Sequence, residues 1–269
     1  MLTLSTLRRW LTNEIPRPPE ATAVVFAHGY LGALPRAYWI GCTRLMAQLR
    51  ARGIAVHVAQ AHMTGRIAER ARHLARELDA TTARRVIVVG HSMGGLDARF
   101  LAAWLDPQHR VSDVITLGTP HHGTYAADMA HRLAPRLPAL VRLLDQGGLY
   151  DLTRAAVARF NAEVPDRPDV RYHAIAGRIA PAAVPAPIRP LARRLQQHDG
   201  DNDGLVPVAS AHWGPTVVID DADHFALIGL EWLAGPDVEA RVSRLFRSDP
   251  RPVGVLRSLL RDCLLRPPG

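Results

Sequence analysis

The chain has 269 residues and a formal net charge of +8, with 33 basic residues against 25 acidic ones, and this length suits one large domain or two small ones. Every basic residue is an arginine, which excludes enzymes that need a Schiff-base lysine or a P-loop lysine. A hydrophobic fraction of 48% and a charged fraction of 22% are typical of a globular protein and exclude a disordered or membrane-spanning chain.

The excess of arginine has two interpretations. Arginines neutralise phosphates, which favours a nucleic acid or an anionic membrane as partner. However, the arginines are spread along the chain and aromatic residues make up only 6% of it, which favours a compositional bias with no nucleic-acid partner.

Neither a membrane span nor a secretory signal is predicted. No apolar run approaches the roughly 18 residues that a transmembrane helix needs. Polar Thr12, Asn13 and Glu14 interrupt the apolar stretch that a signal peptide would require. We therefore expect a cytoplasmic location and leave peripheral membrane association open. Two cysteines, Cys42 and Cys263, make no disulfide framework, and we expect both to be reduced, with a single disulfide as the alternative.

Short β-branched runs alternate with stretches of helical periodicity, which is typical of a parallel sheet covered by helices. The predicted strands are Thr22–Ala27, Ala55–Ala61, Arg85–Gly90, Val114–Gly118, Val170–Ala176 and Thr216–Asp220. The predicted helices are Thr43–Arg52, Gly65–Leu78, Gly94–Leu105, Ala155–Glu163 and Val238–Phe246. The sequence therefore predicts one α/β domain over residues 1–269.

Three stretches depart from this alternation. Apolar residues at helical spacing replace strands between Gly123 and Asp169, and we interpret 124–169 as a helical cap or lid inserted over the ligand-bearing edge of the sheet. The proline-rich Ala180–Pro190 predicts a surface loop, with a mobile lid segment as the alternative. The tail after Arg241 has an apolar helical face, which we expect to pack on its own domain, with membrane docking as the alternative.

The strongest signal is the G-x-S-x-G sequence at 90–94, between a predicted buried strand and a predicted helix. Its glycines lack the Cβ that would clash in a sharp strand-to-helix turn, as in a nucleophile elbow. Such a turn exposes the Ser92 hydroxyl at the carboxyl edge of the sheet. It also places the Met93 amide at the positive end of the helix, where an oxyanion is stabilised. We predict Ser92 as the nucleophile, Met93 as an oxyanion donor, and Asp97 as a salt-bridge or surface residue.

A second segment reaches the same edge. The strand that ends at Ala27 continues into H-G-Y-L-G at 28–32, the place where an esterase has its other oxyanion donor. Gly29 allows the backbone to approach a substrate, and we predict the Tyr30 amide as the donor. His28, Gly29 and Leu31 are candidates for the wall of the substrate pocket.

The acid and the base should follow the nucleophile in the chain. His224 lies in the loop after the last predicted strand and is the predicted general base. Asp203 begins the sharp turn D-G-L-V-P and is the predicted acid that orients this histidine; Asp201 is the next choice. His91, beside the nucleophile, must point away from it. Asp223 is predicted to form a local turn.

Two patterns suggest metals only superficially. His121 and His122 form a histidine pair, but adjacent side chains diverge and no carboxylate or cysteine cluster stands nearby. We predict no metal there and place His121 in the pocket wall. Asp199, Asp201 and Asp203 alternate like calcium ligands, but the glutamate that closes such a loop is missing.

Taken together, these segments resemble the bacterial lipases of the Pseudomonas and Burkholderia type, within the α/β-hydrolase superfamily. The similar segments run through most of the chain: H-G-Y-L-G at 28–32, G-H-S-M-G-G at 90–95, T-L-G-T-P-H-H-G at 116–123, A-R-F-N-A at 158–162, N-D-G-L-V at 202–206 and D-H at 223–224. The resemblance implies an α/β-hydrolase fold with a mostly parallel sheet, a helical lid and a triad of Ser92, Asp203 and His224.

The chain also departs from those lipases. They are secreted with a cleaved signal and often carry a disulfide, and neither is recognisable here. They share a calcium site with an aspartate two residues after the catalytic histidine, where this chain has Ala226. No cofactor is therefore predicted, with structural calcium as an alternative that the missing aspartate disfavours. Met93 stands where they commonly have glutamine, which leaves the backbone donor unaffected.

The predicted function is hydrolysis of carboxylic esters through an acyl-enzyme. Apolar residues in the predicted lid favour a lipid-like acyl ester, hence a lipase or lipid esterase with transient contact to lipid surfaces. An acyltransferase or a polyester depolymerase would use the same triad and is the first alternative. A non-catalytic basic protein that binds lipid or nucleic acid is the second. Acyl-chain length and oligomeric state are not readable from the sequence.

Overall fold

The computed structural model describes residues 15–32, 35–136, 145–184, 186–230 and 251–266. The centre of the protein is a six-stranded sheet in the order β2-β1-β3-β4-β5-β6, in which every neighbouring pair is parallel. The strands are β1 Thr22–Ala27, β2 Ala55–Val58, β3 Arg85–His91, β4 Val111–Leu117, β5 Arg171–Arg178 and β6 Thr216–Asp220.

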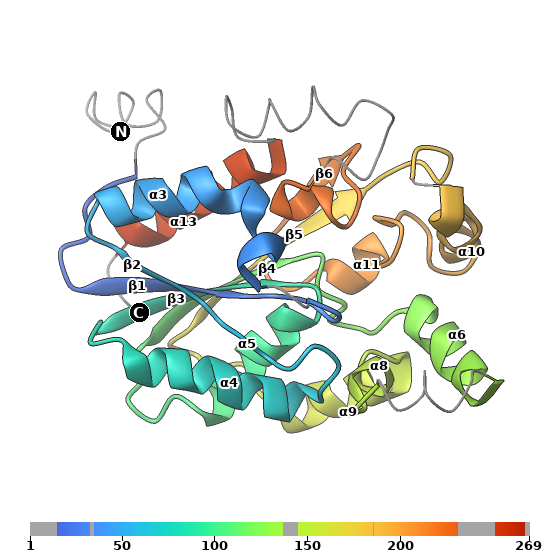
Figure 1. Cartoon of the computed structure of the whole chain (residues 1–269), viewed down its shortest axis with the longest axis horizontal. Helices are drawn as coiled ribbons and strands as arrows, with labels where there is room; N and C mark the ends of the chain where they lie inside the picture. The colour runs from blue at the N-terminus through green and yellow to red at the C-terminus, as the bar shows by residue number, and fades with distance from the viewer. Residues whose placement is uncertain (1–14, 33–34, 137–144, 185, 231–250, 267–269) are drawn as a thin grey trace.

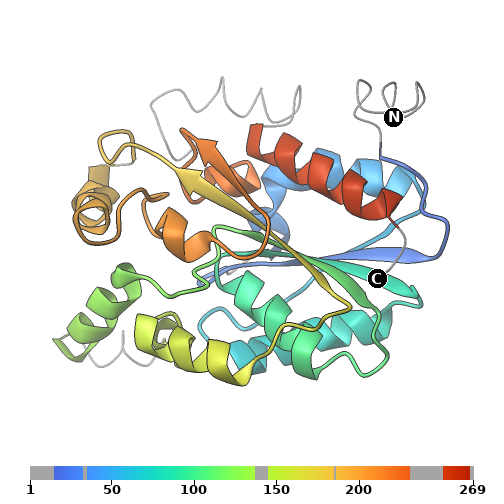
Figure 2. The ribbon, with the colours of Figure 1, turned by 180° about the vertical axis from the view of Figure 1, so that it is seen from behind.

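Helices cover both faces of this sheet (Figures 1 and 2). The helices α3 Thr43–Ala51 and α13 Arg251–Leu265 lie on one face, and α4 Ile67–Ala80, α5 Met93–Trp104 and α9 Arg154–Glu163 lie on the other. Val24 and Phe26 of β1 pack in the apolar cluster under α3 and α13. Ala23 and Val25 pack in the cluster under α4 and α5. Because both faces are covered, β1, β3 and β4 are buried at every residue, which explains their continuous apolar runs.

The remaining elements are shorter or lie at one end of the sheet. They are α2 Pro35–Tyr38, α6 Tyr125–Leu133, α8 Gly148–Asp151, α10 Arg189–Asp199 and α11 Val208–Ala211, with the 3-10 turns η1 Ile40–Cys42, η2 Ala134–Arg136, η3 Ala186–Ile188 and η4 Ala226–Ile228. Helices α6 and α10 lie side by side (Figures 1 and 2), where the rings of Tyr125 and His198 stack 4.6 Å apart.

The strand order locates the ligand-binding edge. The chain runs from β1 outward to β2 and then returns to place β3 on the other side of β1. In an open parallel sheet, ligands bind at the carboxyl ends of the strands where the order reverses. The residues that follow β1 and β3 are His28 and Ser92, so this crevice lies where the sequence predicts the site.

The predicted sheet is confirmed, and the largest difference lies in β4. This strand begins at Val111, three residues before the predicted start, because Ser112 and Asp113 are polar yet buried. Asp113 is accommodated by Arg85 Nη2 at 3.1 Å and Arg171 Nε at 2.7 Å. These ion pairs join residues far apart in the chain, so no local pattern predicts them.

The predicted loop Ala180–Pro190 is partly wrong. Helix α10 begins at Arg189, with Pro190 in its first turn, where the missing N–H of proline costs no hydrogen bond. Proline therefore starts a helix here instead of marking a loop. In the predicted insertion 124–169, the described residues include the helices α6, α8 and α9, and Arg99 Nη1 of α5 donates to Asn161 Oδ1 of α9 at 2.8 Å. A movable lid stays a prediction.

Helix α13 packs in the core. Its apolar face, formed by Val253, Leu256, Leu260, Cys263 and Leu264, is buried on the α3 side of the sheet. Docking of this face on a membrane is therefore wrong, and packing on its own domain is confirmed.

The two cysteines are both buried and free, which confirms the reduced state and excludes the alternative disulfide. The predicted helix Val238–Phe246 lies outside the described residues. Within the described part, no helix has the length and apolarity to cross a bilayer.

The burial of α13 predicts a clear stability difference between two leucines. Leu256 is fully buried, whereas Leu265 is 45% exposed. Leu256→Ala should lower the free energy of unfolding by about 2–5 kcal/mol, and Leu265→Ala by about 0.5 kcal/mol or less. Urea unfolding followed by circular dichroism measures both. Equal losses in the two variants would contradict the packing of α13.

Candidate active site

Ser92 lies in a strained turn between β3 and α5. Its backbone angles are φ 54° and ψ −128°, a conformation that a residue with a side chain rarely adopts. A Cβ on Gly90 would lie 2.4 Å from the Gly94 carbonyl oxygen, and a Cβ on Gly94 would lie 2.4 Å from that of Ala27. Only glycine fits at either position, so the glycines of the G-x-S-x-G sequence permit the predicted sharp turn.

The H-G-Y-L-G segment touches this turn. A Cβ on Gly29 would lie 2.8 Å from Ser92 Cβ, so the two segments meet backbone to backbone. The amides of Tyr30 and Met93 donate to no acceptor in the described ranges. Met93 is also the first residue of α5, where the helix dipole favours an anion. Two available amides beside a serine suit the binding of a developing oxyanion.

Asp203 and His224 form a buried hydrogen-bonded pair. Asp203 Oδ2 lies 2.7 Å from His224 Nδ1, and the two side chains are 1% and 6% exposed. Asp203 Oδ1 accepts hydrogen bonds from the Leu205 and Val206 amides at 3.0 and 2.7 Å. This second set of bonds prevents the carboxylate from turning away from the imidazole.

Asp201 lies elsewhere. Its side chain is 49% exposed and pairs with Arg178 at 3.1 Å. The structure therefore brings Asp203, and not Asp201, to the imidazole. Asp223 Oδ1 accepts from the amides of Phe225 and Ala226 at 2.9 and 2.8 Å, which is the predicted local turn.

The serine turn and the histidine loop meet at the end of β4. The Ser92 amide donates to the Leu117 carbonyl at 2.8 Å. A Cβ on Gly118, the next residue, would lie 3.1 Å from His224 Nδ1 and 2.9 Å from Asp203 Oδ2. The absence of a side chain at Gly118 leaves room for the pair to approach the nucleophile turn.

A network that sequence reasoning missed joins these loops. The Gly29 amide donates to the Tyr38 hydroxyl at 3.1 Å, and this hydroxyl lies 2.5 Å from His91 Nδ1. His91 Nε2 then donates to the His224 carbonyl at 2.8 Å. The network ties the H-G-Y-L-G loop to the His224 loop and turns His91 away from Ser92, as predicted. Tyr38 lies in no motif, so only its position in space shows this role.

His28 is not a pocket residue. It is fully buried, and its ring nitrogens lie 2.8 Å from the Gly29 carbonyl and 3.1 Å from the Ala61 carbonyl. Burial, together with the charge of Arg70, lowers the pKa of His28 to about 4, so the ring is neutral at pH 7. It supports the loop from beneath. Leu31, in contrast, is 61% exposed and is held by its amide bond to the Met63 carbonyl at 2.9 Å.

His121 is likewise buried instead of lining an open pocket. Its Nε2 lies 3.0 Å from Thr116 Oγ1, and its ring stacks on Trp213 with 5.1 Å between centroids. The guanidinium of Arg99 stands over the same indole at 3.7 Å. Burial, with a smaller contribution from Arg99, holds the pKa of His121 well below its usual range. This stack encloses the ring, and the predicted place of His121 in the pocket wall stays a prediction.

One group of candidate metal ligands occurs among the described residues: Asp113, His173 and Cys263. The carboxylate of Asp113 already receives bonds from Arg85 and Arg171. A cation there would face two guanidinium groups, so this donor set does not fit a metal. The predicted absence of a metal or other cofactor stays a prediction.

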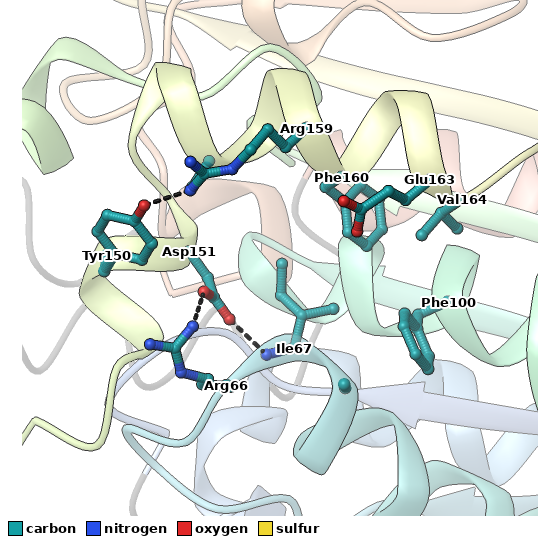
Figure 3. Close-up of a pocket in the computed structure, with 11 residues that line it drawn as sticks. Arg66, Ile67, Phe100, Tyr150, Asp151, Arg159, Phe160, Glu163 and Val164 are labelled. Carbon is teal, nitrogen blue, oxygen red and sulfur yellow. Dashed lines mark hydrogen bonds and ion pairs between the residues drawn. The ribbon is translucent and has the colours of Figure 1, made fainter.

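A pocket of about 230 Å³ opens between α4, α5, α8 and α9 (Figure 3). Apolar Ile67, Phe100 and Phe160 line part of it, and Arg159 and Tyr150 lie across from them. None of the predicted site residues lines this pocket, so it is separate from the candidate active site.

Comparisons with known proteins agree with this architecture. A protein-family profile described as a PGAP1-like alpha/beta domain matches residues 58–134. Triacylglycerol lipase 2 of Saccharomyces cerevisiae is 29% identical over 214 residues, which cover 74% of this chain and 64% of the yeast protein. A triacylglycerol lipase of Burkholderia plantarii is 35% identical over 116 residues, 39% of this chain and 31% of that protein. The chain thus spans less than two thirds of these relatives.

Among solved structures, the mature lipase BlEst2 of Bacillus licheniformis superposes with a TM-score of 0.64 at 26% identity, covering 81% of this chain and 91% of that one. A metagenomic carboxyl esterase superposes with a TM-score of 0.68 at 22% identity, covering 92% and 77%. The chain has the α/β-hydrolase fold and resembles lipases and esterases.

The buried neutral histidines predict a loss of stability in acid. Burial, the largest cause in each case, lowers the pKa of His28, His91 and His121 in the folded state. As the pH falls from 6.5 toward 4, the histidines of the unfolded chain bind protons, whereas the three buried rings of the folded chain stay neutral. Stability should therefore fall by about 1.4 kcal/mol per pH unit for each histidine.

Asp97 acts in the opposite direction, because burial raises its pKa to about 7, and burial also raises the pKa of Asp151 and Asp223. Burial lowers the pKa of His73 and His122 as well, so five histidines oppose three carboxyls and we expect a net loss of stability. Urea unfolding at pH 7.0, 6.0 and 5.0 measures the net change. A free energy of unfolding that holds constant or rises over this range would show that the three rings are not held neutral.

Proposed function

We propose that this chain is a serine carboxylic-ester hydrolase, a lipase or esterase that works through an acyl-enzyme intermediate. The observation that carries this proposal is the buried 2.7 Å contact between Asp203 Oδ2 and His224 Nδ1, next to the strained turn that holds Ser92. This combination supplies a hydroxyl nucleophile, a base and a group that fixes the tautomer of the base.

In the first half of the reaction, Ser92 Oγ attacks the acyl carbon while His224 Nε2 accepts the hydroxyl proton. Asp203 stabilises the imidazolium that forms and remains ionised. The carbonyl oxygen becomes an oxyanion, which accepts hydrogen bonds from the Tyr30 and Met93 amides. The intermediate then collapses, the ester C–O bond breaks, and His224 donates its proton to the departing alcohol.

In the second half, water attacks the acyl carbon of the acyl-serine while His224 Nε2 accepts a proton from it. The same two amides stabilise the second oxyanion. Collapse breaks the bond to Ser92 Oγ, which regains its proton from His224, and the carboxylic acid is released. No step requires a metal or an organic cofactor.

Apolar side chains around the nucleophile turn favour a lipid-like acyl group. Met93 and Leu96 of α5 pack with Ala127 of α6 and with Leu152 and Val157, from the segment that we interpret as the cap. These side chains are buried in the structure, so an acyl chain would contact them only where the predicted lid opens, and it would then meet hydrocarbon and not water. The lipases among the relatives support the same substrate class.

Replacement of the nucleophile tests the proposal. Ser92→Ala should lower kcat for a nitrophenyl ester by about 10⁴-fold or more, because no hydroxyl remains to form the acyl-enzyme. The measurement uses esters from acetate to palmitate, with circular dichroism to verify the fold. A folded variant that retains the activity of the original protein on the preferred ester would exclude the proposed mechanism.

The two aspartates provide a matched comparison. Asp203→Asn should lower kcat by about 10²–10⁴-fold, because the amide no longer stabilises the imidazolium and selects the wrong tautomer. Asp201→Asn removes only an exposed pair with Arg178 and should change kcat less than twofold. Steady-state kinetics on the same ester rank the variants, and the reverse ranking would reassign the acid.

A further inference from the structure

Arg70 is a fully buried cation beneath the candidate oxyanion segment. It lies near the start of α4, and its side chain has no exposed surface. Nη2 donates to the His28 carbonyl at 2.6 Å and contacts the Gly29 carbonyl at 3.4 Å, while Nη1 donates to the His62 carbonyl at 2.5 Å. One guanidinium thus holds the loop after β1 and the loop before α4 together.

Asp97 holds Arg70 in this position. Its Oδ2 lies 2.9 Å from Arg70 Nε and 2.8 Å from Nη2, and the carboxylate is also fully buried. Asp97 belongs to α5, the helix that begins directly after Ser92. The sequence-based expectation of a salt bridge is therefore confirmed, and a surface position is wrong. The pair fastens the oxyanion segment to the helix that follows the nucleophile.

The orientation of the Tyr30 amide follows from what holds the Gly29 carbonyl. Both groups belong to one planar trans peptide, on which C=O and N–H point in opposite directions. Arg70 Nη2 approaches the Gly29 oxygen at 3.4 Å, and His28 Nδ1 donates to it at 2.8 Å in the tautomer that carries the ring proton on Nδ1. The preceding peptide is held by Arg70 at the His28 oxygen. Rotation of either peptide would break these contacts.

A buried ion pair seldom improves stability over an apolar pair of the same shape. Apolar side chains, however, could not bind three carbonyl oxygens. The contacts of Arg70 therefore suit a role in geometry more than one in stability.

We propose that Arg70, held by Asp97, is a positioning residue that orients the Gly29–Tyr30 peptide so that the Tyr30 amide faces the oxyanion formed at Ser92. This inference rests on the proposed ester hydrolysis. An oxyanion exists only in the transition state and the tetrahedral intermediate, so misorientation of the amide raises the barrier and leaves substrate binding nearly unchanged. The substrate itself does not touch Arg70.

The test measures kcat, KM and the affinity for a trifluoromethyl ketone, whose adduct with the nucleophile places an oxyanion in the hole. Arg70→Met should lower kcat by roughly 30-fold or more, approaching the 10²–10³-fold loss caused by removal of a whole donor. KM should stay within about threefold, as for an interaction made only in the transition state, and the affinity for the ketone should fall by the same factor as kcat.

Arg85→Met is the matched control. Arg85 forms another buried ion pair, with Asp113 at 3.1 Å, at the opposite end of β3. Its replacement should lower the melting temperature as Arg70→Met does, but kcat per folded molecule and the affinity for the ketone should not change. If kcat falls by a similar factor in both variants, Arg70 has a merely structural role and the inference is overturned.

Arg70→Lys tests the inference even where Arg70→Met does not fold. One ammonium group cannot reach the carboxylate and three carbonyls together, so kcat should fall about tenfold with KM nearly unchanged. Asp97→Asn should have a smaller effect of the same kind. Unchanged kcat in Arg70→Lys, or lower kcat with unchanged affinity for the ketone, would overturn the inference. Activity that survives Ser92→Ala would overturn the proposed function instead.

Discussion

The crowding of three backbone segments at Ser92 is the constraint on which the rest of the structure depends. The ends of β1 and β3 and the start of α5 approach so closely that a Cβ at Gly29 or Gly94 would overlap a neighbouring segment. This closeness accompanies the left-handed conformation of Ser92. It also brings the H-G-Y-L-G segment against the start of α5, and the amides of Tyr30 and Met93 donate to no backbone carbonyl within the described ranges. Once the turn exists, a base need only reach one point in space, and the loops after β4, β5 and β6 converge there because parallel strands end at one edge.

Buried charged side chains occur both near this turn and at the opposite end of β3, where each forms an ion pair with a buried aspartate. Two buried arginines each join segments far apart in the chain: Arg70 binds carbonyls of two loops, and Arg85 binds the Cys263 and Arg266 carbonyls at the end of α13. Arginine suits such positions because its fork donates several bonds in fixed directions. The arginine-only composition first suggests a polyanionic partner, yet these two side chains serve the fold.

Most of the strands were predictable because they are short apolar runs rich in β-branched residues, whereas the errors have specific physical causes. The start of β4 was missed because Asp113 is charged, and its pairing with Arg85 and Arg171 is decided by strands and helices distant in sequence. The first two residues of α10 were predicted as part of a loop because proline disrupts helices in the middle but not at the start. The apolar face of the tail had two possible partners, core or membrane, and only the packing of α13 against the sheet distinguishes them.

For the site, the sequence by itself determined the serine turn and led to the proposed order of nucleophile, acid and base, because these depend on glycines and strand ends that are local in the chain. Tertiary structure decided the rest. Asp203 lies against His224, whereas Asp201, two residues earlier, lies at the surface beside Arg178. His28 and His121, which were predicted in the pocket wall, are buried in the interior. Tyr38 and Arg70, which belong to no sequence motif, bind the loop that follows β1. The physical reason is that these contacts join loops separated by tens of residues, and a folded sheet alone brings those loops to one edge.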